Sequence, residues 1–349
     1  MPTMPDHVTG GVDTHLDVHV AAALDSIGGL LGVRSFPTTA AGYRRLLTWL
    51  GSFGHVERVG VEGSGSYGAG LTRHLLDHDI AVVEVDRPNR QRRRRRGKSD
   101  PLDAISAARA AQSGDAAGEA KSRDGNVESI RVLRVARASA RKARTQALNQ
   151  LRSLVSTAPD DLRAQLRGLS IPALLETASG LRPAGRTDVL GATKLALRTI
   201  AQRARFLEAE IAQLDAVLDP IVERTAPALV ARSGVGPDTA GALLVAVGDN
   251  PERLRSEASF AHLCGVAPIE ASSGKVERHR LDRGGDRQAN SAIWRIVITR
   301  MSGDPDTRAY VERRMKEGRS KLEAIRCLKR YVARELYAHL PVDAAQRVA

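Results

Sequence analysis

The chain has 349 residues, of which 42% are apolar, so it is long enough for two or three packed units rather than one. Its formal net charge is +13 at pH 7, and its clustered basic residues favour a polyanionic partner, with nucleic acid as the first candidate. No stretch approaches the roughly 20 apolar residues that span a bilayer, and Met1–Asp6 lacks the charged segment followed by an apolar one that a secretory signal would show. The two cysteines, Cys264 and Cys327, lie far apart, which argues against a structural zinc site or a disulfide framework and favours a reducing cytoplasm.

Residues 8 to about 118 are predicted to form an α/β unit. Apolar runs at 8–12, 15–24 and 31–36 predict a meander of three strands, with Gly28 and Gly29 in a turn. The pattern then predicts a helix over 40–49, a strand over 56–61, a helix over 68–78, a strand over 80–85 and a helix from Asp100. This order is that of a ribonuclease-H-like fold, in which functional residues gather at strand ends.

Four acidic residues stand where such strands and helices begin or end. Asp13 follows the first strand, Glu62 closes a later one, and Asp100 and Asp103 open a helix with the i, i+3 spacing that puts both on one face. Carboxylates packed together raise one another's pKa values, and divalent cations remove that conflict. We therefore predict a metal site that acts on phosphates. Asp17 would face the same side of a strand as Asp13 and is left out of the site.

Each acid also has a simpler interpretation. Asp13 could cap a turn, Glu62 could be a solvated surface charge, and Asp100 could be a helix N-cap.

A basic loop precedes Asp100. It contains Arg87, Arg90, Arg92, Arg93, Arg94, Arg95, Arg96 and Lys98. A nucleic-acid backbone held by this loop would pass beside the predicted metals, and its affinity would fall steeply with salt. The alternative is a loop that only aids solubility. Aromatic residues make up 3% of the chain, which argues against extended base stacking on single strands.

From about Asn126 the composition predicts long helices. An alanine and leucine face contains Ala136, Ala140, Ala143, Ala147, Leu151 and Leu154, and a different, basic face contains Arg131, Arg134, Arg137, Arg141 and Arg144. After a connection punctuated by Pro and Gly over 159–186, a second helix carries Ile200, Ala204, Leu207, Ile211, Leu214 and Leu218 and should end at Pro220. These helices predict an antiparallel hairpin or coiled coil, either as a bundle core or as a dimer seam.

The region from about Ala226 offers two further candidate sites. Gly234 and Gly236 form a tight turn before a helix, which could present backbone N–H groups to a DNA phosphate, or could simply join two core helices. Farther on, Ser272 and Ser273 precede a glycine in a basic segment with Lys275, Arg278 and Arg280. A serine there could act as a nucleophile beside arginines that offset phosphoryl charge, although such a segment is more often a flexible turn.

Taken together, these segments resemble the DEDD-type insertion-sequence transposases of the IS110 family over nearly the whole chain. The resemblance rests on Gly11-Val12-Asp13, Val61-Glu62-Gly63-Ser64-Gly65-Ser66-Tyr67, Lys98-Ser99-Asp100-Pro101-Leu102-Asp103-Ala104, Gly234-Val235-Gly236, and Gly265-Val266-Ala267-Pro268 before Ser272-Ser273-Gly274. It implies a RuvC-like nuclease domain over 1–120, a helical coiled-coil region over 121–225, and a mostly helical transposase domain with a helix-hairpin-helix-like element over 226–349.

The resemblance also implies an activity. Asp13, Glu62, Asp100 and Asp103 would bind Mg²⁺, as one or two ions for which Mn²⁺ can substitute, and Ser273, rather than Ser272, would attack DNA to form a covalent phosphoserine link. The implied partners are double-stranded DNA at element ends and target, a noncoding bridge RNA, and further subunits in a homodimer or homotetramer of the prokaryotic, nucleoid-associated cytoplasm. The rival predictions are a junction-resolving nuclease that uses water, and a basic architectural DNA-binding protein.

Overall fold

The structure is a computed structural model, and it describes residues 7–85, 99–116, 118–183, 188–273 and 279–341. The chain folds as two compact units. The first unit combines Met1–Glu128, Leu244–Asn290 and Arg326–Ala349, and the second combines Ser129–Leu243 and Ser291–Ile325. The three-domain division at residues 120 and 225 stays a prediction.

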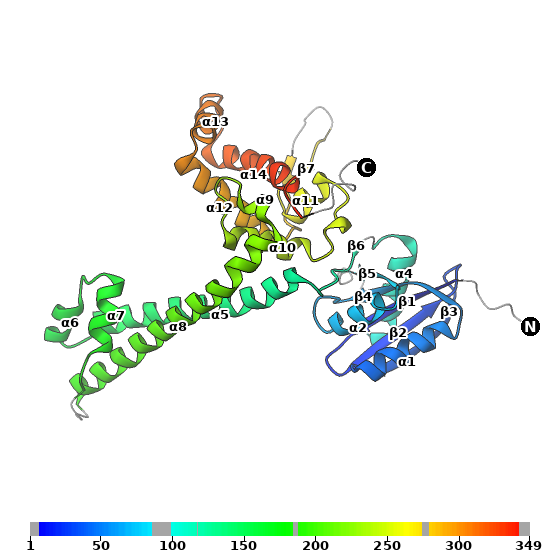
Figure 1. The fold of residues 1–349 in the computed structure, drawn as a ribbon, viewed down its shortest axis with the longest axis horizontal. Helices are drawn as coiled ribbons and strands as arrows, with labels where there is room; N and C mark the ends of the chain where they lie inside the picture. The colour runs from blue at the N-terminus through cyan, green and yellow to red at the C-terminus, as the bar shows by residue number, and fades with distance from the viewer. Residues whose placement is uncertain (1–6, 86–98, 117, 184–187, 274–278, 342–349) are drawn as a thin grey trace, which may run out of the picture. The chain divides into compact units, whose positions relative to one another are not determined.

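The N-terminal part of the first unit is an α/β sheet structure (Figure 1). Its elements are β1 (His7–Thr14), β2 (Val18–Leu24), β3 (Leu30–Pro37), α1 (Ala40–Gly51), β4 (His55–Glu62), α2 (Ala69–Leu76), β5 (Ala81–Val85), α4 (Asp100–Ser113) and β6 (Gly118–Glu119). The predicted order of three strands, helix, strand, helix, strand and helix is confirmed. The turn between β2 and β3 is stabilised by the Asp25 carboxylate, which accepts hydrogen bonds from the backbone N–H groups of Ile27 and Gly29.

The sheet has the strand order β3-β2-β1-β4-β5-β6. β4 is parallel to both β1 and β5, whereas β1–β2, β2–β3 and β5–β6 are antiparallel. Because side chains alternate along a strand, Val12 and Val61 face one side of the sheet, and Gly11 and Gly60 face the other. Val12 and Val61 join a hydrophobic core with leucines of α1 and α2. α4 packs against the glycine side.

The remaining elements of the chain are mostly helices. They are α5 (Asn126–Ser156), α6 (Asp160–Leu166), α7 (Ile171–Ser179), α8 (Val189–Thr225), α9 (Pro227–Val230), α10 (Pro237–Val247), the 3₁₀-helix Pro251–Arg253, α11 (Glu257–Leu263), β7 (Pro268–Glu270), β8 (His279–Leu281), α12 (Arg287–Gly303), α13 (Pro305–Lys316) and α14 (Lys321–Tyr337). The prediction of an α/β part with a mostly helical remainder is confirmed. Among the described residues, no helix is both long and apolar enough to cross a membrane.

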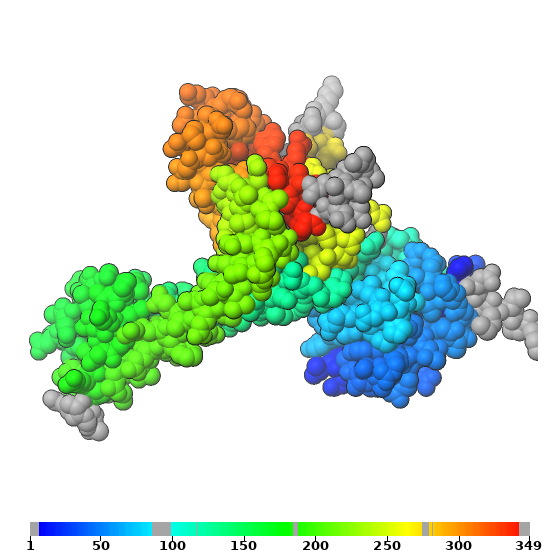
Figure 2. Space-filling view, in the orientation of Figure 1, coloured from blue at the N-terminus to red at the C-terminus, as the bar shows by residue number. Residues whose placement is uncertain are grey.

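α5 and α8 form an antiparallel hairpin within the second unit, and the two helices lie side by side in Figures 1 and 2. Gln150 pairs with Arg203, whereas Arg144, earlier in α5, pairs with Glu208, later in α8. The two helices therefore run in opposite directions. At one end, α6 and α7 complete a hydrophobic core with them. The sequence predicted only a punctuated connection there, because α6 and α7 are too short to produce a sustained helical period.

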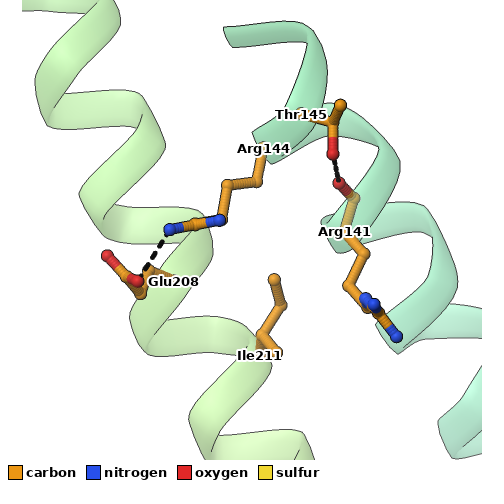
Figure 3. A pocket seen from close by; sticks show the side chains of 5 residues that line it. All are labelled: Arg141, Arg144, Thr145, Glu208 and Ile211. Carbon is orange, nitrogen blue, oxygen red and sulfur yellow. Dashed lines mark hydrogen bonds and ion pairs between the residues drawn. The ribbon is translucent and has the colours of Figure 1, made fainter. Parts of the chain in front are cut away.

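The basic face of α5 contacts acidic residues of neighbouring helices. Arg137 pairs with Asp215 of α8 and with Asp238 of α10, and Arg144 donates to Glu208 at 2.8 Å. Arg144 and Glu208 line a pocket of about 260 Å³ between the helices, and Figure 3 shows Arg144 extending from α5 toward the Glu208 carboxylate on α8. Arg137 and Arg144 therefore contribute to the packing of α5 against the neighbouring helices.

The predicted end of α8 at Pro220 is also wrong, because the helix continues to Thr225. A proline inside a helix removes one backbone hydrogen bond and costs about 3 kcal/mol. Leu218 and Val222, on either side of it, are almost fully buried. Their burial offsets that cost, so the packing of these two side chains keeps the helix continuous past Pro220.

Candidate metal centre at the strand ends

Asp13 and Glu62 lie beside each other at the ends of two parallel strands. Asp13 directly follows Val12 on β1, and Glu62 directly follows Val61 on β4. Val12 and Val61 are paired across the two strands. Because side chains alternate, both carboxylates face the side of the sheet that α4 covers. The backbone is fixed at this point by the Thr14 hydroxyl, which donates to the carbonyl oxygen of Glu62 at 2.7 Å.

Two glycines bring α4 close to these strand ends. A Cβ atom on Gly11 would lie 2.1 Å from the backbone nitrogen of Ala108, and one on Gly60 would lie 2.5 Å from the carbonyl oxygen of Ala107. The helix backbone therefore lies directly against β1 and β4. This close approach places the first turn of α4, with its two acids, at the same edge as Asp13.

The first turn of α4 holds the remaining predicted acids. Ser99 is the N-cap residue with an extended backbone, and Asp100 and Asp103 occupy the first helical turn. Asp100 is thus not the N-cap. Asp103 is 7% exposed, as is Glu62, and Asp13 is 6% exposed, so three of the four carboxylates are buried. This burial excludes a solvated surface charge as the account of Glu62.

The environment of Asp13 disfavours its ionised form. Burial raises the pKa of its carboxyl group above the ordinary value, His15 lowers it, and the charges of Asp103 and Asp100 raise it again. Asp13 is therefore electrostatically coupled to both acids of α4. A buried carboxylate whose pKa is raised, as that of Asp13 is, is stabilised in its ionised form when a divalent cation binds.

His15 belongs to the same cluster and was not predicted. Its Nε2 lies 3.1 Å from Oδ2 of Asp13 and 3.5 Å from Oδ1 of Asp100. One ligand atom from each of these three residues lies within 4.8 Å of the other two. The alternating pattern predicted His15 inside a strand, whereas the structure ends β1 at Thr14 and begins β2 at Val18. Asp17 lies exposed in the same connection, so its predicted strand position is wrong.

The residues present fit a divalent cation. Oxygen ligands are those that Mg²⁺ and Mn²⁺ prefer, and Asp13, Glu62, Asp100 and Asp103 supply carboxylates at one edge of the sheet. Asp13 and Asp100 have ligand atoms close enough to share one ion. Glu62 ends the neighbouring strand β4, and Asp103 lies in the same first turn of α4 as Asp100.

Ser273 lies in a different segment, just beyond the end of β7. β7 and β8 form a short antiparallel hairpin in which Glu270 pairs with His279, and Ser273 is exposed beyond that pair. Nothing in the geometry of the described residues joins Ser273 to the acids, so its role stays a prediction.

The other predicted contact residues are only partly described. Arg280 is exposed on β8. Lys275, Arg278 and the whole basic loop from Arg87 to Lys98 lie outside the described residues.

The turn with Gly234 and Gly236 packs tightly against its own unit. Gly234 has φ +74°, and Arg300 donates to the neighbouring Ser233 carbonyl at 2.8 Å. The N–H group of Gly236 donates to Oγ1 of Thr239. In this conformation the Gly236 N–H group is already hydrogen-bonded within the protein. A phosphate contact at the turn stays a prediction.

Two family models match different parts of the chain. A family model described as "Transposase", of the DEDD type of IS110, matches residues 10–158, and the model of the "Transposase IS116/IS110/IS902 family" matches residues 227–312. The first match includes all four acids, and the second includes Ser273.

Two relatives are uncharacterized proteins of insertion elements. The 43.6 kDa protein of insertion element IS110 from Streptomyces coelicolor is 33% identical over 145 residues, which are 41% of this chain and 34% of that protein. The 42 kDa protein of insertion element IS900 from Mycobacterium paratuberculosis is 26% identical over 144 residues, which are 40% of this chain and 36% of that protein. The aligned part thus spans about a third of each relative. With both family models matched in order, the chain belongs to the IS110 family of insertion-element transposases.

Proposed function

We propose that the chain is a metal-dependent DNA transposase that cuts at the ends of its own insertion element and joins them to a target. The observation that carries this proposal is the group of buried carboxylates, Asp13, Glu62 and Asp103, with Asp100 at the mouth of the same site. The sheet order with β1 central and the acids at strand ends supports a RuvC-like ribonuclease-H domain over residues 1–120. Coiled-coil and transposase domains over 121–225 and 226–349 complete the proposed division.

The four acids would hold one or two Mg²⁺ ions, with Mn²⁺ as a substitute. When bound, such ions stabilise the charge on the attacking and leaving oxygens of a phosphoryl transfer. The protein's own contribution is positional. The Thr14 hydroxyl fixes the ends of β1 and β4, and the contact of α4 with Gly11 fixes the first helical turn that carries Asp100 and Asp103.

Ser273 is the proposed nucleophile. Its hydroxyl oxygen attacks a DNA phosphorus, a serine–phosphorus ester forms, and the bond from phosphorus to one sugar oxygen breaks. The serine hydroxyl loses its proton, and the departing sugar oxygen gains one. Because one phosphodiester replaces another, strands can be exchanged without a nucleotide cofactor. The exposed position of Ser273 in the connection between β7 and β8 is compatible with access to DNA.

Double-stranded DNA at the element ends and the target is the proposed substrate. The basic loop over 87–98 and Lys275, Arg278 and Arg280 would contact its backbone, and the turn with Gly234 and Gly236 would contact a phosphate. Sequence recognition is proposed to come from a bridge RNA. A homodimer or homotetramer in the nucleoid-associated cytoplasm would bring the acids of one subunit to Ser273 of another.

A recombination assay tests the proposal. Full-length protein is incubated with element-end DNA, target DNA, Mg²⁺ and the noncoding transcript from beside the gene. Wild type should join strands, whereas Asp13→Asn should bind DNA without cutting it, and Ser273→Ala should form no covalent species. Asp17→Asn, an exposed acid four residues from Asp13, is the matched control and should retain activity.

Each rival function predicts a different result. Cleavage that persists in Ser273→Ala, with free ends and no covalent species, would identify a water-using nuclease and overturn the serine mechanism. Unchanged function in both Asp13→Asn and Ser273→Ala would identify an architectural DNA-binding protein and overturn the enzymatic proposal altogether.

A further inference from the structure

The connection between β1 and β2 holds a histidine at the edge of the acidic cluster, and its geometry is close to that of a metal ligand. His15 Nε2 is 3.1 Å from the Asp13 carboxylate and 3.5 Å from the Asp100 carboxylate. Two ligands at right angles on one ion, each about 2.1 Å from it, are about 3 Å apart. The observed separations are thus close to those of neighbouring corners of one coordination shell.

The backbone on both sides of His15 is held in place. The Thr14 hydroxyl donates to the Glu62 carbonyl at 2.7 Å, and the His15 carbonyl accepts from the Thr38 hydroxyl at 3.2 Å. The Asp17 carbonyl accepts from the Thr38 backbone N–H at 2.9 Å. The connection is therefore anchored to the segment between β3 and α1, and the imidazole is presented to the cluster from a fixed backbone.

The position of the ring also suits a ligand that closes the site from the solvent side. The His15 side chain is 42% exposed and that of Asp100 is 48% exposed, whereas that of Asp13 is 8% exposed. His15 and Asp100 therefore lie at the mouth and Asp13 lies beneath them. An ion bound among the three would have buried oxygen on the protein side and open positions for substrate oxygens outside.

We propose that His15 is a nitrogen ligand of the metal centre and that it makes the centre select Mn²⁺ over Mg²⁺. Imidazole binds transition metals well, whereas Mg²⁺ is a hard cation that favours oxygen ligands. A site built only from carboxylates would discriminate little between the two ions. Adding one imidazole therefore raises the affinity for Mn²⁺ without a matching gain for Mg²⁺. This inference rests on the proposed metal-dependent function and goes beyond its four acids.

The competing account is that His15 only donates a hydrogen bond to Asp13. The two accounts differ once an ion is bound. An imidazole that only donates a hydrogen bond to Asp13 would not be a ligand of the metal, whereas the proposed imidazole would bind it through nitrogen. His15→Gln separates them: the amide NH₂ can still donate to Asp13, but glutamine brings no imidazole nitrogen.

The experiment measures Mn²⁺ bound to the full-length protein without DNA, so it does not depend on catalysis. Titration calorimetry gives the affinities for Mn²⁺ and Mg²⁺, and pulsed electron paramagnetic resonance of the Mn²⁺ complex detects coupling to a ¹⁴N nucleus. Variants are His15→Gln, His15→Ala, Asp13→Asn and the control His55→Ala. His55 is an exposed histidine at the opposite end of β4 from Glu62.

Wild type and His55→Ala should show ¹⁴N coupling and tighter binding of Mn²⁺ than of Mg²⁺. His15→Gln and His15→Ala should lose the coupling, and their Mn²⁺ affinity should fall about 10-fold or more while their Mg²⁺ affinity changes little. Mn²⁺ binding that needs Asp13 but shows no ¹⁴N coupling, or equal Mn²⁺ affinity in His15→Gln, would overturn this inference alone. Absence of any divalent-ion binding that depends on Asp13 would overturn the proposed function as well.

Discussion

Replacing Gly11 with alanine should separate α4 from the sheet and inactivate the acidic site. The new Cβ atom would lie 2.1 Å from the backbone nitrogen of Ala108, whereas ordinary contacts begin at 3.4 Å, so strand and helix must separate by about 1.3 Å. The neighbour is backbone, so a smaller side chain at Ala108 cannot relieve the contact. Overpacking of this kind costs about 1–3 kcal/mol. The same shift would move Asp100 and Asp103 away from Asp13, and a displacement of about 1 Å can cost about 100-fold in rate.

The assay compares DNA cleavage rate and thermal unfolding of wild type, Gly11→Ala, Gly11→Ala combined with Ala108→Gly, and Gly51→Ala. Gly51 ends α1, and a Cβ atom there would meet nothing within 4 Å, so it is the matched control and should leave both readouts unchanged. Gly11→Ala should lose activity even where the protein remains folded, and the second substitution should not restore it. Wild-type activity in Gly11→Ala would refute the argument that this contact positions the acids.

Three further changes should have smaller or more general effects. Asp238→Asn should lower the free energy of unfolding by about 2 kcal/mol. Burial alone would raise the pKa of Asp238, but the hydrogen bond from Arg295 and the charges of Arg134, Arg295 and Arg137 lower it from 3.8 to about 2. The advantage of the wild type should therefore be full above pH 3.8 and vanish as the pH falls to about 2; a pH-independent difference in urea unfolding would contradict this. Asp249→Ala should cost about 1 kcal/mol, because its carboxylate accepts from the backbone N–H groups of Val127 and Glu128 at the start of α5. Asp17→Ala is its control, and equal melting temperatures of the two variants would count against the cap. Changing all arginines of 92–96 to glutamine should weaken DNA binding and reduce the slope of log affinity against log salt by about 0.9 for each phosphate that the loop neutralises, and an unchanged slope in fluorescence anisotropy would exclude the loop from the interface.

The α/β order could be predicted because its determinants are local. Short apolar runs mark β1 to β3, Gly28 and Gly29 mark the turn between β2 and β3, and the Asp25 carboxylate closes that turn by accepting from the Gly29 N–H group. The acids could be placed because strand ends and a helix start are visible in the sequence. Their convergence, however, depends on how closely α4 approaches Gly11, which is a packing property.

What the sequence did not predict depends on contacts between distant segments. Arg137 was assigned to a basic face without partners named for it, and its partners Asp215 and Asp238 lie 78 and 101 residues away. Likewise Pro220 ends no helix, because burial of the residues on either side outweighs the lost hydrogen bond.

The missed histidine has a more local cause. An alternating pattern from 15 to 24 predicted one continuous strand, but β2 begins only at Val18. A shift of three residues at a strand start moves His15 from a strand into the connection that borders the acids. Strand boundaries are the least certain part of such a prediction, and here the boundary determines whether a side chain belongs to the site.

We propose that the carboxylate cluster and Ser273 act together in one DNA-joining reaction. The most direct test is to trap the reaction on element-end DNA with Mg²⁺, digest the protein and the DNA, and locate the nucleotide remnant by peptide mass spectrometry. We predict a remnant on Ser273 in the wild type, and none in Ser273→Ala or in Asp13→Asn. A remnant on another residue, or cleaved DNA with no protein-linked nucleotide in the wild type, would contradict the claim.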